Sequence, residues 1–379
     1  MNETELQTEL LAWFEHGMEA PAEADRFNRL ALEVFAHQFA RNRPYSAFCR
    51  SRGAAPANIT CWRDIPAVPT GAFKEADLTT CAPHEIQVTY RTSGTSRGGG
   101  KRGRHLLPDT TLYDASLIPN FRAHVLPDRT TIRVLAAGPT ARFFPESSLG
   151  HMYSAILSRF GATGSGTFWR DDGPRFPCLA AALRKAETDT APVLLLGTAF
   201  GFVLLMDWLE EQGLQFALPP GSRLVDTGGY KGRSREVPRN ELYSLYGTRL
   251  GIPLTHVVNE YGMTELGSQF YDTILRDTLA GRSVRPRAKS IPPWVRVEIV
   301  DPETLEPAPE GQVGLIRIFD LANLHSVVAV QTDDLGRSLG DRFEVLGRAG
   351  GAEIRGCSLI AEEWSEQTMA SENVRSYME

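Results

Sequence analysis

Residues 254–265 of this chain read LTHVVNEYGMTE, which places a polar motif directly after an apolar run. Its apolar run at 256–258 predicts a short buried strand that leads directly into a polar, glycine-containing turn. In α/β folds, ligands bind beyond the carboxyl ends of the parallel strands. At that place the sequence offers the ring of Tyr261 for stacking, the hydroxyl of Thr264, and the carboxylate of Glu265, which could hold Mg²⁺ beside a triphosphate.

The residues on the N-terminal side of this stretch alternate apolar runs with helical periodicity. We expect strands at 131–136, 193–196, 222–226 and 254–258, and helices at 151–160, after the second strand as far as 209, and at 237–250. Strands that alternate with helices indicate parallel βαβ units, and therefore an α/β fold.

The flanking regions have other patterns. Residues 4–51 are helical in period, and the proline-rich segment 62–73 is expected to be extended. After Pro292 the pattern changes to short strands with turns between them, at 294–300, 312–319, 326–331 and 342–346. We therefore expect a helical N-terminal segment with the α/β core at 1–290, a small β subdomain at 291–350, and a short C-terminal tail at 351–379.

The composition excludes several classes of protein. The 379 residues include 40 lysines and arginines against 46 aspartates and glutamates, a formal net charge of -6. That balance gives no general attraction to nucleic acid, so no nucleic-acid partner is expected. With 18 Phe, 10 Tyr and 6 Trp, the chain has too many aromatic residues to be disordered as a whole. The oligomeric state is left open.

The sequence contains no evident targeting signal. The N-terminus is acidic, which argues against a signal peptide. The most apolar window, 191–209, is interrupted by Pro192, Gly197, Gly201 and Asp207, which favours a strand, a turn and a helix over a membrane span. The five cysteines show no zinc-binding spacing, which favours free thiols in a reducing compartment. We expect a cytoplasmic protein.

A second motif lies at 90–104, YRTSGTSRGGGKRGR. Glycines let backbone amides turn toward an anion, hydroxyls add donors, and a lysine supplies a point charge for phosphate oxygens. The candidate phosphate ligands are Thr92, Ser93, Gly94, Thr95, Ser96 and Lys101. The spacing is not that of a Walker A loop. A solvated surface loop and an arginine–glycine RNA-binding segment are the alternatives.

A third motif occupies 331–336, QTDDLG, and is followed by Gly347-Arg348. A carboxylate suits the paired hydroxyls of a ribose, and an arginine suits a phosphate or a ribose edge. Asp334 and Arg348 are therefore candidate nucleotide ligands.

These three motifs, in this order, resemble those of the adenylate-forming superfamily of acyl- and aryl-CoA synthetases, peptide-synthetase adenylation domains and luciferase. Within that superfamily the chain is most similar to the LuxE-type acyl-protein synthetases. Further stretches support that resemblance: IPAVPTGAFKE at 65–75, TGGYKG at 227–232 and RGCS at 355–358. The resemblance implies the α/β fold of a large adenylate-forming N-terminal domain, which agrees with the expected parallel βαβ units and small β subdomain. The C-terminal lid that the superfamily normally carries is expected to be essentially absent here.

The resemblance also implies a role for each candidate residue. Thr92, Ser93, Gly94, Thr95, Ser96 and Lys101 would bind the β- and γ-phosphates of ATP, Gly228, Gly229 and Tyr261 would enclose adenine, and Asp334 and Arg348 would bind the ribose. Thr264 would meet the α-phosphate and Glu265 would hold Mg²⁺. ATP and Mg²⁺ are thus the expected cofactors.

Two departures from the superfamily pattern stand out. The ribose motif usually carries glycine where Asp333 stands here, although Asp334 keeps the aligned position. Moreover, only a short lysine-free stretch follows Arg348, whereas the superfamily lid delivers a catalytic lysine. We expect another cation to replace it, with Lys101, Lys74 and Lys231 as the candidates.

Two further residues have candidate roles. A cysteine near the C-terminus accepts the acyl group in the acyl-protein synthetases, and Cys357 matches it in position and neighbours. Its alternative role is a small residue that closes the β subdomain. His151 opens a predicted helix, where it could line the acyl pocket or be structural.

The expected function is ATP-dependent activation of a carboxylic acid, preferably a fatty acid, to acyl-AMP, with acyl transfer to a protein cysteine. The acceptor could be a protein, a carrier or CoA. One alternative is an aryl-acid adenylating ligase of a natural-product pathway. A second is a non-catalytic nucleotide-binding partner protein.

Overall fold

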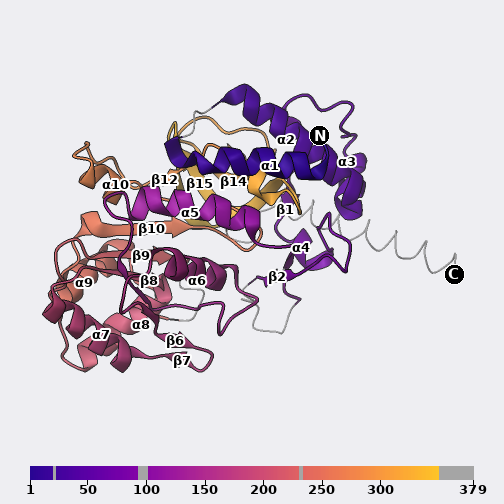
Figure 1. Ribbon diagram of the computed structural model, residues 1–379. Helices are drawn as coiled ribbons and strands as arrows, with labels where there is room; N and C mark the ends of the chain where they lie inside the picture. Colours follow the sequence, from indigo (N-terminus) through magenta and orange to yellow (C-terminus); the bar gives the residue numbers. More distant parts are fainter. Residues whose placement is uncertain (20–22, 93–100, 230–233, 350–379) are drawn as a thin grey trace. The chain divides into compact units, whose positions relative to one another are not determined.

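Four stretches of chain, 1–19, 23–92, 101–229 and 234–349, are described in the computed structural model (Figure 1). Their contacts divide the chain into two units, and both units are discontinuous in sequence. Unit 1 contains residues 1–119, 263–268 and those from 290 onward, and unit 2 contains 120–262 and 269–289. The chain passes from unit 2 to unit 1 within β12 (Lys289–Ser290). The predicted division into 1–290, 291–350 and 351–379 stays a prediction.

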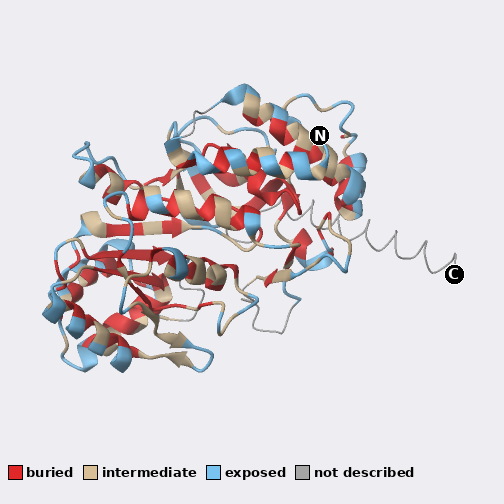
Figure 2. Cartoon of the chain, viewed as in Figure 1, coloured by how far each residue is buried: buried red, intermediate tan, exposed pale blue. Residues whose placement is uncertain are grey.

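Unit 2 contains the predicted parallel sheet. Its six strands follow the order β11-β10-β9-β8-β4-β5, and only the β10–β11 pair is antiparallel. The strands are β4 (Arg133–Ala136), β5 (Gly166–Thr167), β8 (Val193–Thr198), β9 (Arg223–Thr227), β10 (Val257–Tyr261) and β11 (Phe270–Tyr271). Every residue of β8 and β9 is buried (Figure 2), as expected for strands that are covered on both faces.

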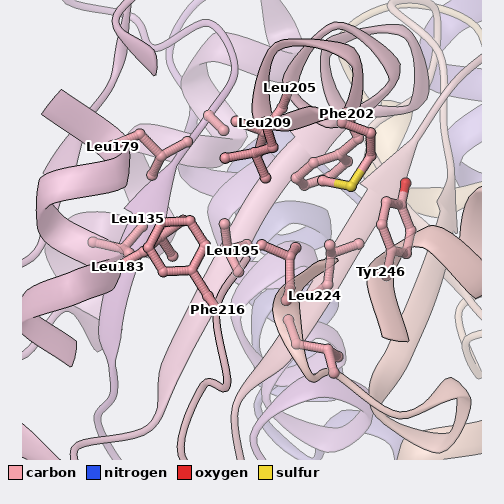
Figure 3. Packing of buried hydrophobic residues seen from close by; sticks show 14 of the residues in the cluster. Leu135, Leu179, Leu183, Leu195, Phe202, Leu205, Leu209, Phe216, Leu224 and Tyr246 are labelled. Carbon is pink, nitrogen blue, oxygen red and sulfur yellow. The ribbon is translucent and has the colours of Figure 1, made fainter. Parts of the chain in front are cut away.

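Three helices cover one face of this sheet. They are α7 (Phe176–Asp189), α8 (Ala199–Glu211) and α9 (Arg239–Leu250). Their apolar side chains interlock with Leu135, Leu195 and Leu224 of the sheet in one buried cluster (Figure 3). Phe202 contacts Tyr246 edge-on, with ring centroids 5.4 Å apart. The 3.6-residue period that predicted α8 and α9 therefore corresponds to real buried faces.

A second group of aromatic residues in unit 2 lies outside that cluster. Phe121 packs against Phe160 and Tyr271, with ring centroids 5.6 and 5.9 Å apart. Phe121 belongs to α5 (Thr111–Val125), and Phe160 ends α6 (Ser148–Phe160). The remaining elements of this unit are β6 (Trp169–Arg170), β7 (Gly173–Pro174), the 3-10 turn η3 (Leu254–His256) and α10 (Ile274–Leu279).

Unit 1 is built on an antiparallel sheet in which β13, β14, β15 and β16 pair in sequence order. These strands are β13 (Val295–Val300), β14 (Val313–Asp320), β15 (Ala329–Ser338) and β16 (Arg342–Arg348). Strand β1 (Val68–Pro69) adds to β15 in parallel, with Val68 opposite Val330. The prediction that 62–73 is extended is confirmed only around β1, which joins the C-terminal sheet. At its ends the prediction is wrong, because η2 (Trp62–Asp64) is a 3-10 turn and α4 (Ala72–Glu75) begins within the range.

The N-terminal helices pack on this unit. They are α1 (Glu3–Glu15), α2 (Ala24–Arg41) and α3 (Arg43–Ser51), followed by α4 (Ala72–Glu75) and the hairpin of β2 (Val88–Arg91) and β3 (Arg104–Leu107). The 3-10 turns are η1 (Gly17–Glu19), η2 (Trp62–Asp64) and η4 (Leu321–Asn323). Phe14 lies 4.8 Å from Trp294 between ring centroids, and Asn42 Nδ2 donates to Ser326 O at 3.1 Å. The helices therefore share a core with the β segments after residue 290.

Most predicted strand boundaries are within two residues of those in the structure, and two predicted strands differ by more. The strand expected at 254–258 begins only at Val257, because residues 254–256 form the 3-10 turn η3 after Pro253. The strand expected at 326–331 is β15, which continues to Ser338 through the TDDLG motif. Pairing with β14 and β16 on both sides overrides the turn preference of the two aspartates and Gly336.

The apolar window at 191–209 forms β8 and α8, as predicted. Across the described ranges, no helix combines the length and the apolar character that a membrane crossing requires. The four cysteines in these ranges, Cys49, Cys61, Cys81 and Cys178, are free thiols.

Candidate active site

The predicted phosphate loop connects β2 and β3 in unit 1. At its base the Thr92 amide donates to Gly103 O at 3.0 Å, and the Gly103 amide donates to Thr92 Oγ1 at 2.9 Å. A Cβ added at Gly103 would meet Thr92 Cγ2 at 3.0 Å, so the hairpin closes tightly there. Thr92 is therefore positioned by the hairpin. The next predicted ligands, Ser93, Gly94, Thr95 and Ser96, lie outside the described residues.

Lys101 stands at the described end of the same loop. Its Nζ lies 3.6 Å from Glu75 Oε2, and the lysine side chain is 60% exposed. An exposed ion pair of this kind contributes little to stability, so a phosphate group could take the place of the carboxylate at small cost. Lys74 is exposed on α4 beside Glu75. Lys231, the third candidate cation, lies outside the described residues.

The residues predicted to enclose adenine lie at neighbouring strand ends in unit 2. The parallel register pairs Glu260 of β10 with Thr227 of β9, so Tyr261 and the glycines Gly228 and Gly229 follow paired residues. The Thr227 hydroxyl donates to the Glu260 carboxylate and links the two ends. Gly228 has φ +68°, a backbone conformation that glycine adopts without strain. The structure thus brings these three predicted residues to one edge of the sheet.

A network of polar side chains lies next to these strand ends. Asn259 Nδ2 donates to Asp226 Oδ1 at 2.8 Å, and Lys289 Nζ donates to Asn259 O at 2.7 Å. Arg287 Nη1 donates to Asp272 Oδ2 at 2.6 Å. Burial lowers the pKa of Lys289 to about 8, against the attraction of Asp272 and other carboxylates. Burial also raises the pKa of Asp226.

His151 lies in the first turn of α6, also in unit 2. The helix begins after Ser147, whose Oγ accepts from the Gly150 amide at 3.0 Å. The imidazole is half-buried. Its predicted part in the acyl pocket stays a prediction.

Thr264 and Glu265 belong to a short segment, 263–268, that is part of unit 1. Glu265 is 7% exposed. His105 Nδ1 donates to Thr264 O at 2.7 Å, and Asn323 Nδ2 donates to Glu265 O at 2.9 Å. The backbone that presents the hydroxyl and the carboxylate is thus fixed by two buried side chains from other parts of the unit.

Asp334 and Arg348 lie opposite each other in the β15–β16 register. Arg348 Nε is 3.6 Å from Asp334 Oδ1, and the arginine side chain is 72% exposed. Its neighbour Asp333, the departure from the superfamily pattern, accepts from Thr70 Oγ1 at 3.2 Å. Asp333 therefore has a structural partner from the IPAVPTGAF stretch, and Asp334 is the carboxylate beside the arginine.

Several residues around the motifs were not predicted from the sequence. His105, Asp320 and Asn323 are all buried polar residues that contact the 264–268 segment. The signal available was a polar residue inside an apolar run, as in RIFDLANL at 317–324. Cys357, the predicted acyl acceptor, lies outside the described residues.

Two buried histidines predict how stability depends on pH. Burial lowers the pKa of both His105 and His124 to about 4, whereas an unfolded histidine titrates near 6.5. Between these values the unfolded chain binds protons that the folded chain does not, so the free energy of unfolding falls as the pH drops from 6.5 toward 4. Burial raises the pKa of Asp320 to about 6, which opposes the change in part.

Together, His105, His124 and Asp320 are expected to lower the free energy of unfolding by roughly 2 kcal/mol between pH 7 and pH 5. Urea unfolding followed by circular dichroism at both pH values measures it. His124→Gln should reduce the pH dependence, and an unchanged dependence in that variant would contradict the assignment of the loss to this histidine.

Comparison with known proteins extends these observations. The sequence model of the family described as acyl-protein synthetase, LuxE, matches residues 14–365. Two relatives from Vibrio harveyi and Aliivibrio fischeri are both named long-chain-fatty-acid–luciferin-component ligase. The first is 24% identical over 343 residues, with 88% of this chain and 86% of the relative covered. The second is 23% identical over 314 residues, with 82% and 78% covered.

Solved structures show the same fold. An open conformation of 2-hydroxyisobutyryl-CoA ligase with 2-HIB-AMP and CoA superimposes with a TM-score of 0.60 at 14% identity, over 85% of this chain and 69% of that one. The same enzyme in its thioesterification state gives 0.59 at 15% identity, over 92% and 69%. The predicted adenylate-forming α/β fold is therefore confirmed.

Proposed function

Because this chain belongs to the acyl-protein synthetase (LuxE) family, we propose that it uses ATP to activate a fatty acid as acyl-AMP and transfers the acyl group to a protein thiol. The observation that carries the proposal is the family match over residues 14–365, which includes all three nucleotide motifs and Cys357. By its family the chain is an ATP-dependent ligase.

The proposed reaction has two steps, adenylation of the acid and transfer of the acyl group to a thiol. A carboxylate oxygen of the acid attacks the α-phosphorus of ATP, the bond to the bridging oxygen of the β-phosphate breaks, and pyrophosphate leaves. A thiolate then attacks the acyl carbonyl carbon and the carbon–oxygen bond to AMP breaks. AMP leaves, and the acyl group remains on the sulfur as a thioester. Since the first step joins two anions, the protein must position them and neutralise their charge.

The residues present suit these tasks. We propose that Thr92, Ser93, Gly94, Thr95, Ser96 and Lys101 bind the β- and γ-phosphates, that Gly228, Gly229 and Tyr261 enclose adenine, and that Asp334 and Arg348 bind the ribose. Thr264 would donate its hydroxyl to the α-phosphate. The register that places Asp334 beside Arg348 and the strand ends that bring Gly228 near Tyr261 support these roles.

The donor set also fits Mg²⁺. This ion commonly takes one or two carboxylates, keeps several waters, and completes its shell with substrate phosphates. Within the described ranges no three histidine, cysteine or acidic side chains gather into a metal cage. We propose that Glu265 alone supplies the protein carboxylate. Bound Mg²⁺ would neutralise charge on the phosphate oxygens.

The acceptor and the location are further parts of the proposal. Cys357 is the proposed acyl acceptor in this chain, from which a partner protein, a carrier or CoA would take the acyl group. The free thiols of Cys49, Cys61, Cys81 and Cys178 support a reducing, cytoplasmic location.

The test is acid-dependent release of pyrophosphate. The protein is incubated with ATP, Mg²⁺ and a panel of saturated fatty acids of graded length and aryl acids. We expect release with fatty acids, and covalent labelling of the chain by a radiolabelled fatty acid. The Cys357→Ser variant should keep pyrophosphate release and lose the thioester label.

Other outcomes identify the alternatives. Release with aryl acids alone, indifferent to Cys357→Ser, would indicate an aryl-acid ligase. ATP binding without release by any acid would indicate a non-catalytic nucleotide-binding protein, and the proposed function would be wrong.

A further inference from the structure

The segment 264–268, which carries Thr264 and Glu265, is held by side chains from four other elements of unit 1. His105 of β3 donates to Thr264 O, and Asn323 of η4 donates to Glu265 O at 2.9 Å. Ser116 of α5 donates from Oγ to Gly267 O at 2.6 Å. Asp320, at the end of β14, accepts from the Gly267 and Ser268 amides at 3.0 and 2.8 Å.

Asp320 forms the centre of this arrangement. Besides the two amides it accepts from Ser268 Oγ at 2.7 Å and from the Ala322 amide at 3.0 Å, and it is fully buried. Trp294 Nε1 donates to the same Ser268 hydroxyl at 3.1 Å. A buried carboxylate without hydrogen-bond donors would strongly destabilise the fold. These four donors therefore stabilise the Asp320 carboxylate, and the carboxylate in turn fixes the backbone of the segment.

The segment packs tightly against the η4 turn at Gly267. A Cβ added at Gly267 would lie 2.8 Å from Ala322 Cβ and 3.0 Å from the Ala322 carbonyl carbon and oxygen. The turn η4 that carries Asn323 is itself held by Gln38 of α2, whose Nε2 donates to Asn323 O at 2.8 Å. The helix α2, η4 and the 264–268 segment thus form one continuous hydrogen-bonded and packed chain of contacts.

We propose that His105, Ser116, Asp320 and Asn323 are positioning residues that fix the 264–268 backbone, so that the Thr264 hydroxyl and the Glu265 carboxylate hold one geometry toward nucleotide and Mg²⁺. The inference rests on the proposed function. All four form hydrogen bonds to the backbone of the segment or to Ser268. Substituting any of them therefore keeps the Thr264 and Glu265 side chains themselves in the chain. Misplacing a reacting group by about 1 Å can cost about 100-fold in rate.

Two buried serines of unit 1 allow a matched test. Ser116 Oγ donates to Gly267 O at 2.6 Å, and Ser326 Oγ donates to Leu78 O at 2.8 Å, outside the segment. Ser116→Ala and Ser326→Ala therefore remove equivalent side-chain–backbone hydrogen bonds, only one of which reaches the segment. Both variants are compared with the parent for melting temperature, pyrophosphate release, kcat, KM for ATP at several Mg²⁺ concentrations, and Kd for Mg²⁺-ATP by equilibrium dialysis.

We expect similar falls in melting temperature for the two variants. Ser116→Ala should lower kcat/KM for ATP at least tenfold and raise the Mg²⁺ concentration needed for half-maximal rate, whereas Ser326→Ala should stay within twofold of the parent. A melting temperature falls for any structural loss, but the apparent Mg²⁺ requirement of the folded enzyme changes only when the ligands are displaced. Gly267→Ala is a second variant of the segment, because its added Cβ would press on Ala322. If Ser116→Ala folds too poorly to be measured, Gly267→Ala should show the fall in kcat/KM for ATP and the raised Mg²⁺ requirement.

Equal kinetic constants in Ser116→Ala and Ser326→Ala, with an active parent, would overturn the positioning role and leave the proposed function intact. A parent that releases no pyrophosphate with any acid would overturn the proposed function instead. In that case the dialysis decides: equal Kd values for both variants, or no binding by the parent, overturn the positioning role as well.

Discussion

Replacing Lys101 with alanine is expected to reduce acid-dependent pyrophosphate release by about 100-fold or more. Lys101 stands at the described end of the proposed phosphate loop, and its Nζ lies 3.6 Å from the exposed carboxylate of Glu75. A cation aimed at the charge that develops on transferring phosphate oxygens commonly contributes about 10²–10³ in rate. Steady-state release of pyrophosphate with saturating fatty acid measures the effect.

Lys185→Ala is the matched control for this variant. Lys185 of α7 is 68% exposed and its Nζ lies 3.2 Å from Asp189 Oδ2, so it too is an exposed lysine in an ion pair with a carboxylate. Its removal should leave the rate unchanged within twofold, and neither variant should lose measurable stability. A Lys101→Ala rate close to that of Lys185→Ala would remove Lys101 from the phosphate-binding residues.

Asp128→Asn is expected to lower the free energy of unfolding strongly, because it breaks an ion pair with a buried arginine. Arg223 of β9 is fully buried, and its two terminal nitrogens donate to Asp128 Oδ1 and Oδ2 at 2.7 and 2.9 Å. Burial raises the pKa of Asp128, but the hydrogen bonds from Arg223 and Arg129 outweigh it and hold that pKa below its usual value. An asparagine would leave the guanidinium buried without a counter-charge.

Breaking a buried pair of this kind costs about 3–5 kcal/mol, and the 26% exposure of Asp128 moves the expectation to the lower end. The control is Asp207→Asn, which breaks the exposed pair with Arg235, where the two side chains are 35% and 50% exposed. That variant should lose about 1 kcal/mol or less. Urea unfolding of the three proteins measures both losses, and equal losses would show that Arg223 is not held by Asp128.

The periodicity of the sequence predicted the fold where one element buries its own pattern. The apolar run Val193 to Leu196 and the apolar residues of α8 could be recognised in the sequence, because each element buries residues whose local spacing shows its type. Periodicity says which face is buried and not what covers it. For that reason the sequence did not predict that α1 and α2 share a core with Trp294 and the sheet after residue 290.

The motifs that carry the candidate residues could be identified from the sequence, whereas the buried residues that support them could not. Glycines, hydroxyls and charges stand close together around Thr92, Lys101 and Glu265, and this density can be seen in the sequence alone. Asp320 and Asn323 carry no such density. Their importance lies in the tertiary contacts that bring them to a segment more than fifty residues earlier in the chain.

The parallel pairing of Val68 with Val330 sets the order in which the chain can complete its folding during synthesis. All parts of unit 2 have been made once residue 289 is added, whereas β1 and the N-terminal helices must wait for β15. At the usual rate of translation, the time between the synthesis of β1 and the synthesis of β15 is on the order of tens of seconds. The first-made part of the chain is thus the last to be finished, and during that interval its apolar helix faces are the surface that a nascent-chain chaperone would meet.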